Sequence, residues 1–137
     1  LEFRRVLFRS PPKQSSGEAV PGGDWSETVV PTSTLLFRYS AVTFNGHRIH
    51  YDYPYVTGTE GYSGLVVHGP MIATLSLRAF CRANPEARLR RFAYRGVRPL
   101  IAPQPFSVGG RLLEPGKAQL WAGNDAGIAQ SAEVDFD

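Results

Sequence analysis

At 137 residues the chain fits one domain, which can bury a sufficient hydrophobic core without disulfide bonds. Its single cysteine excludes an intramolecular disulfide and favours a reducing, cytoplasmic location. The formal net charge is +3, but three of the 15 basic and one of the 12 acidic residues fall in the first ten positions. The other 12 basic and 11 acidic residues nearly balance, which does not favour a nucleic-acid partner. No run approaches the ~20 apolar residues of a membrane span, and the amino end lacks the apolar core of a signal peptide, so we expect a soluble protein.

The first 24 residues differ in composition from the rest. Leu1–Ser10 has no initiator Met and resembles the translation of a sequencing-adapter oligonucleotide fused to a gene fragment. Residues 11–24 are rich in Pro, Gly and Ser, which predicts a flexible interdomain linker. We therefore expect one folded domain over residues 25–137, the carboxyl part of a longer protein.

A short strand is predicted over residues 27–30 and a helix over residues 35–42, with Thr32 or Ser33 able to cap the helix. The apolar positions at helical spacing are Leu35, Leu36, Tyr39 and Val42. Residues 43–64 show no sustained period, which predicts a long irregular loop with one short turn, of the kind that often carries function.

Gly69 and Pro70 mark the start of a second helix, over residues 70–83. Its apolar residues surround most of the helix, so we expect it to be buried and Cys81 to act as a small hydrophobe rather than as a nucleophile. Turn residues then separate four predicted strands: 89–94, 105–113, 118–123 and 128–136. This order predicts an α+β fold with an antiparallel β-sheet curled around a central helix.

All three histidines, His47, His50 and His68, fall between residues 47 and 68. His47 and His50 are three residues apart with Asp52 close by, a spacing that can ligate zinc, but no fourth ligand presents itself. A metal site is therefore the less favoured interpretation. Asp52 is expected to pair with a histidine or to cap the next turn.

Two runs carry a family resemblance: RYSAVTFNGHRIHYD at residues 38–52 and GYSGLVVHGP at residues 61–70. They resemble MaoC-like hot-dog proteins, whose hydratase-2 motif is written Asp-x-Asn-Pro-x-His, in the branch of 3-hydroxyacyl-thioester dehydratase type 2 and mesaconyl- or itaconyl-CoA hydratases. The spacing puts the motif's His on His50, its Asp on Asn45 and its Asn on His47. The resemblance covers about residues 25–136 and implies a hot-dog fold and a hydro-lyase acting on enoyl or 3-hydroxyacyl thioesters.

On this resemblance His50 is the acid/base residue, Asn45 holds the attacking water, and the backbone N–H of Gly69 stabilises charge on the thioester oxygen. Asn45 departs from the motif, and because an amide does not take up a proton, His50 is its one titrating group. A structural hydrogen bond is the alternative for His50, and a tight turn for Asn45. His47 and His68 are expected beside the substrate. No metal or cofactor is implied other than coenzyme A as part of the substrate.

The basic residues are densest between residues 78 and 98, and Arg95 and Arg98 are the candidates for contact with carrier phosphates. Alternating arginines are equally typical of a solvated strand face. A hot-dog thioesterase is the alternative enzyme, for which Glu60 is the available carboxylate. A non-catalytic acyl-binding half is the other alternative. Hot-dog domains pair, so we expect a homodimer or a missing amino-terminal hot-dog domain as partner, and no membrane.

Overall fold

The computed structural model describes residues 17–137, so the predicted appended segment and residues 11–16 of the predicted linker lie outside the described residues. From β1 onward the described chain is α+β, as predicted. Its elements are β1 (Trp25–Val29), α1 (Ser33–Val42), the 3-10 turn η1 (Arg48–His50), α2 (Tyr53–Gly58), α3 (Gly69–Ala83), β2 (Leu89–Gly96), β3 (Phe106–Leu112), β4 (Lys117–Asn124) and β5 (Gly127–Phe136).

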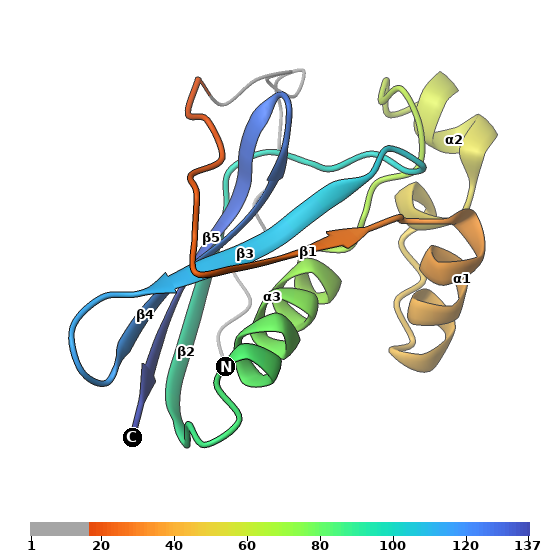
Figure 1. Cartoon of the computed structure of the whole chain (residues 1–137). Coiled ribbons are helices and arrows are strands. Elements are labelled where there is room, and N and C mark those ends of the chain that lie inside the picture. Colours follow the sequence, from red (N-terminus) through yellow and green to blue (C-terminus); the bar gives the residue numbers. More distant parts are fainter. Residues whose placement is uncertain (1–16) are drawn as a thin grey trace.

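The five strands form one antiparallel sheet in the order β1-β3-β4-β5-β2. Helix α3 crosses one face of this sheet, and α1 and α2 lie beyond one end of it (Figure 1). The predicted antiparallel sheet around a central helix is confirmed. Upstream of β1, the Ile128 N–H donates to Glu18 O and the Asp24 N–H to Gly110 O, so the described part of the predicted linker contacts the sheet.

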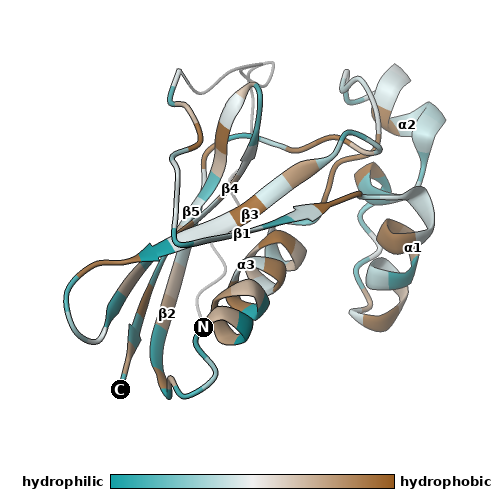
Figure 2. Ribbon diagram, in the orientation of Figure 1, coloured by the Kyte–Doolittle hydropathy of each residue, from teal (hydrophilic) through white to brown (hydrophobic). Residues whose placement is uncertain are grey.

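Helix α3 is buried on one face only, which corrects the expectation of burial on most sides. Figure 2 shows hydrophilic as well as hydrophobic residues along it. Cys81 is exposed, so its predicted role as a packed hydrophobe was wrong. The reason is that the sheet covers one side of the helix. The residues on that side are Met71, Ile72, Ala73, Ser76, Ala79 and Phe80.

The segment before α3 is more ordered than the sequence predicts. Helix α2 occupies residues 53–58, where an irregular loop was expected. Asp52 caps it, since Asp52 Oδ1 accepts from the Tyr55 N–H at 3.1 Å, and Pro54 occupies the first turn. Thr32 caps α1 in the same way, with Oγ1 accepting from the Leu35 N–H at 3.1 Å.

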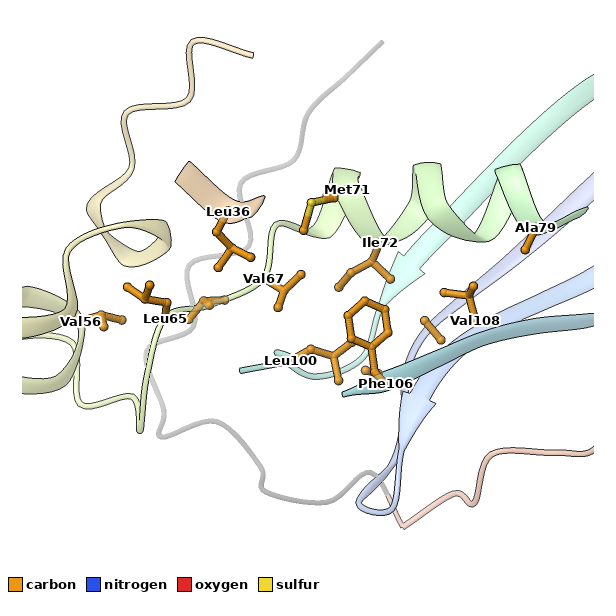
Figure 3. Packing of buried hydrophobic residues seen from close by; sticks show 13 residues of the cluster. Leu36, Val56, Leu65, Val67, Met71, Ile72, Ala79, Leu100, Phe106 and Val108 are labelled. Atoms are coloured by element: carbon orange, nitrogen blue, oxygen red, sulfur yellow. The ribbon is translucent and has the colours of Figure 1, made fainter. Parts of the chain in front are cut away.

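One apolar cluster joins the α1–α2 region to the sheet. Leu36 and Val56, both at 0% exposure, pack beside Leu65, and the cluster continues through Ile72 to Phe106 (Figure 3). Because the same core holds both regions, the η1 segment has a fixed position relative to the start of α3. None of the helices within residues 17–137 has both the length and the apolar character to cross a membrane.

Candidate active site

A cavity of about 620 Å³ opens between the η1–α2 segment and the start of α3. Four stretches of chain supply its walls: residues 47–62, residues 66–72, residues 96–100 and residues 129–130. The lining residues are His47, Ile49, His50, Tyr55, Glu60, Tyr62, Val66, Val67, Gly69, Ile72, Gly96, Arg98, Pro99, Leu100, Ala129 and Gln130. The volume is typical of a small-molecule binding site.

His50 is a buried imidazole in this wall, 6% exposed. Its Nδ1 lies 2.6 Å from Val66 O, and because a carbonyl only accepts, Nδ1 carries the proton. The other nitrogen, Nε2, makes no hydrogen bond to the described residues and holds the lone pair. Burial lowers the pKa of His50, the Val66 hydrogen bond opposes this in part, and the charge of His47 adds to it. These features favour the neutral form of His50, which can act as a base.

His68 lies directly behind His50. The two rings stack with centroids 3.7 Å apart and planes 17° apart, and His68 Nε2 lies 2.8 Å from Ser40 Oγ of α1. His68 is fully buried, and burial together with the charge of His50 lowers its pKa to about 4. It does not line the cavity, so it supports the His50 ring rather than facing a ligand.

Asn45 and His47 form a turn ahead of η1. Asn45 Oδ1 accepts from the His47 N–H at 3.1 Å, and Phe44 before it has φ 53. The His47 ring lines the cavity, 5.7 Å from the His50 ring. Asn45 does not line it, which matches the turn that the sequence left open as its alternative role.

Gly69 is the first residue of α3 and lines the cavity. Its N–H makes no hydrogen bond to any residue in the described part of the chain, as is usual for the first turn of a helix. Gln130 Nε2 donates to Gly69 O at 3.0 Å, while Gln130 Oε1 is buried without a partner. Gln130 was not identified from the sequence, since it lies within an ordinary strand.

The two predicted arginines differ. Arg98 lines the cavity, whereas Arg95 is exposed on β2 and does not. Among residues 17–137, no three His, Cys, Asp or Glu side chains come together in a group that could hold a metal ion.

The sequence model of hydroxyacyl-thioester dehydratase type 2 matches residues 1–102. Mesaconyl-C(4)-CoA hydratase of Chloroflexus aurantiacus is 43% identical over 143 residues, which cover 98% of this chain and 50% of the relative. The mitochondrial hydroxyacyl-thioester dehydratase type 2 of Schizosaccharomyces pombe is 35% identical over 99 residues, covering 71% of this chain and 32% of the relative. The chain thus spans half or less of the length of these curated relatives.

Solved structures are similar over the whole domain. A MaoC-like dehydratase from Phytophthora capsici matches with a TM-score of 0.72 at 14% identity, over 99% of this chain and 47% of that one. An R-hydratase from Pseudomonas aeruginosa matches with a TM-score of 0.70 at 17% identity, over 91% of this chain and 85% of that one. These likenesses confirm the hot-dog fold. With the match of the family model over residues 1–102, the chain belongs to the hydroxyacyl-thioester dehydratase type 2 family.

Proposed function

We propose that this chain carries the catalytic site of a hydro-lyase that adds water to an enoyl thioester or removes it from a 3-hydroxyacyl thioester. The observation that carries the proposal is one cavity that holds both the free Nε2 of a buried, neutral His50 and the unpaired N–H of Gly69. A base and an oxyanion donor are the two groups that this reaction requires.

In hydration, His50 Nε2 takes a proton from water as the water oxygen bonds to the β carbon. The C=C electron pair shifts toward the thioester oxygen, and the enolate that forms accepts a hydrogen bond from Gly69 N–H. The imidazolium then returns its proton to the α carbon, which restores the thioester and the neutral ring. Dehydration is the reverse sequence, and neither direction needs a metal or redox cofactor.

His68 and Ser40 act through His50. A neutral ring, stacked at 3.7 Å and held by Ser40, fixes the imidazole plane while Val66 O fixes its tautomer. For Asn45 the geometry favours a positioning role, since its side-chain oxygen orders the turn that carries His47 to the cavity.

Coenzyme A is the proposed carrier because the relative from Chloroflexus aurantiacus is named as a CoA-thioester hydratase. Since the chain covers 50% of that relative, we also propose that a second hot-dog domain, on another copy or on another segment, pairs with it. A cytoplasmic site of action is proposed with it, because the single thiol, Cys81, is free and exposed.

A thioesterase is the second candidate because Glu60 lines the same cavity as His50. The Glu60 carboxylate accepts from Tyr55 Oη at 2.8 Å, and a carboxylate near a thioester is what hydrolysis needs. Family membership favours the hydro-lyase. The two reactions yield different products, so they separate cleanly in one assay.

The test uses crotonyl-CoA and follows two signals, loss of enoyl-thioester absorbance and release of free CoA thiol. The hydro-lyase consumes the enoyl group without releasing thiol, and His50→Gln is expected to slow it ~10²–10⁴-fold with the fold intact. Arg95→Met, a substitution at an exposed residue outside the cavity, is the control. Thiol release that depends on Glu60, or hydration unaffected by His50→Gln, would overturn the proposal.

A further inference from the structure

Gln130 of β5 makes the one hydrogen bond that joins the first turn of α3 to a strand within residues 17–137. Its Nε2 donates to Gly69 O at 3.0 Å, at the end of α3 that lines the cavity. Because a carbonyl oxygen only accepts, the amide nitrogen must face it, and the orientation of the amide is therefore determined. The rest of α3 is held on the sheet by apolar side chains and, farther along the helix, by ion pairs of Arg78 and Arg82 with Glu27.

The Gln130 side chain is buried at a position that would suit an apolar residue. Gln130 is 3% exposed and lies opposite Ala122 of β4, and the next pair on the same face is Leu120 with Ala132, all three of them buried. Its Oε1 is buried without a partner in the described part of the chain. A buried amide with an unpaired oxygen is less stable than an apolar side chain of similar size. Core stability therefore does not account for this glutamine, and such unfavourable groups are typical of functional sites.

The hydrogen bond acts on the residue that carries the proposed oxyanion donor. The peptide that contains the Gly69 N–H has its oxygen, His68 O, bonded to the Ile72 N–H at 3.1 Å. Since the N–H and C=O of a trans peptide point in opposite directions, the Gly69 N–H points out of the helix start. The following peptide, between Gly69 and Pro70, carries the oxygen that Gln130 binds. Gly69 has no Cβ to restrict its torsions, so Gln130 limits rotation at this residue.

Resting on the hydro-lyase function proposed above, we propose that Gln130 is a positioning residue, which holds the Gly69 N–H in place for the thioester oxygen. His50 is held by Val66 O and the His68 ring, on the segment before α3, whereas Gln130 holds Gly69 from the sheet. Apolar packing is non-directional and tolerates small displacements of the helix start, whereas a hydrogen bond restricts both distance and angle. Loss of the Gln130 bond should therefore misplace the donor and leave the base intact.

The experiment measures single-turnover hydration of crotonyl-CoA by Gln130→Met in the full chain. Methionine has a similar length and no amide, so the hydrogen bond is lost while the volume stays filled. The chemical step should slow about tenfold, less than the roughly 100-fold loss expected when the donor itself is removed. Binding of saturated butyryl-CoA should change less than about threefold. The free energy of unfolding should not fall, because the unpaired Oε1 is gone.

A double-mutant cycle tests whether Gln130 acts through the donor. Gly69→Pro has no N–H at position 69, the first residue of α3, where proline is tolerated. Adding Gln130→Met to Gly69→Pro should slow the chemical step less than about twofold, since no donor is left to misplace. An equal loss with and without the Gly69 N–H would overturn the proposal, because Gln130 would then act by another route.

Infrared spectra of butyryl-CoA, isotope-labelled at the thioester carbonyl, give a readout that needs no turnover. A hydrogen bond to the carbonyl oxygen weakens the C=O bond and lowers its stretching frequency. The bound label should absorb at a lower frequency in wild type than in solution, and Gln130→Met should move it back toward the solution value. An unchanged frequency in Gln130→Met would overturn the positioning role.

Gln119→Met is the matched control, because it makes the same chemical change on β4 outside the cavity. Gln119 Oε1 accepts from Arg111 Nη2 at 2.9 Å, so this substitution also removes a side-chain hydrogen bond. It should leave the chemical step and the carbonyl frequency unchanged, and a loss equal to that of Gln130→Met would contradict a specific role for Gln130.

Gln130→Leu, which also lacks the amide, covers the case in which Gln130→Met does not fold. If neither variant folds, the amide is required for the fold and the positioning role is overturned. If wild type hydrates crotonyl-CoA and the variants are equally fast, the positioning role fails and the hydro-lyase function stands. If wild type does not hydrate crotonyl-CoA, the proposed function fails first and this inference fails with it.

Discussion

The Gly69→Pro substitution deletes the one N–H proposed to stabilise the thioester oxygen and preserves the helix that carries it. Gly69 is the first residue of α3, where a missing N–H costs the helix no hydrogen bond. His68 before it has φ −62 and ψ 127, the extended conformation that a following proline requires. Apart from its own chain neighbours and the nearby backbone of α3, the nearest atom to a Cβ at position 69 is Gln130 Nε2, at 4.0 Å. The variant should therefore fold.

The expected loss follows from the role of the donor. Removing one oxyanion donor raises the barrier by about 3 kcal/mol, which is roughly 100-fold in kcat. Gly69→Ala is the matched control because it adds the same Cβ and retains the N–H, so its kcat should stay within about threefold of wild type. Single-turnover hydration of crotonyl-CoA gives the chemical step directly.

Binding of saturated butyryl-CoA, measured by calorimetry, reports whether the proline ring blocks the cavity. A dissociation constant close to that of Gly69→Ala assigns the rate loss to the missing donor. The reasoning is refuted if Gly69→Pro and Gly69→Ala turn over at the same rate, because the Gly69 N–H would then contribute nothing to the transition state.

Further outcomes follow from the histidine pair and the turn before it. His50 is active as the neutral base and its pKa is lowered, so kcat/KM should be level at neutral pH and fall only below pH 6.5; an acid limb centred above 6.5 would contradict this. Asn45→Ala should raise KM more than it lowers kcat, and Asn45→Asp, which keeps the acceptor for His47 N–H, should restore both; a loss confined to kcat would instead indicate water positioning. Ser40→Ala leaves the buried His68 Nε2 unpaired and should lower the free energy of unfolding by about 1–3 kcal/mol in urea titrations, with no loss indicating that the bond is dispensable. The pKa of His68 is about 4 in the folded state, so between pH 6.5 and 4 only the unfolded state gains its proton. The free energy of unfolding should therefore fall as the pH is lowered across that window. His68→Gln should flatten this dependence, and an unchanged slope would exclude His68 as its source.

The strands and α3 could be predicted because each is long enough for its period to show. The predicted strand over residues 118–123 became β4 at Lys117–Asn124, and the helix over residues 70–83 begins one residue earlier, at Gly69. Helix α2 could not be predicted in this way, because its six residues span fewer than two turns and show no measurable period. Only its start signals, Asp52 and Pro54, were present in the sequence.

The prediction that Cys81 is packed in the core failed for a different reason. The apolar residues of α3 are spread widely enough that the sequence does not identify which face meets the sheet. That choice is made by long-range packing of α3 against the strands, where Phe80 is fully buried and the next residue, Cys81, is exposed. A helical period in the sequence predicts that the helix has a buried face. Tertiary contacts determine which residues form that face.

The site follows the same division between local and long-range information. The motif runs identified His50 and Gly69. They did not identify Gln130, or Ser40 although it lies within the first run, because the partners of these two residues lie 61 and 28 residues away. Predicting the position of Gln130 would have required the register of the strands in the sheet. Strand β2 pairs with β5 so that Gly96 lies opposite Gln130, and the chain leaving β2 then carries Arg98 past the same point. Once that register is known, Gln130, which has no local signal in the sequence, is placed at the cavity wall beside the start of α3.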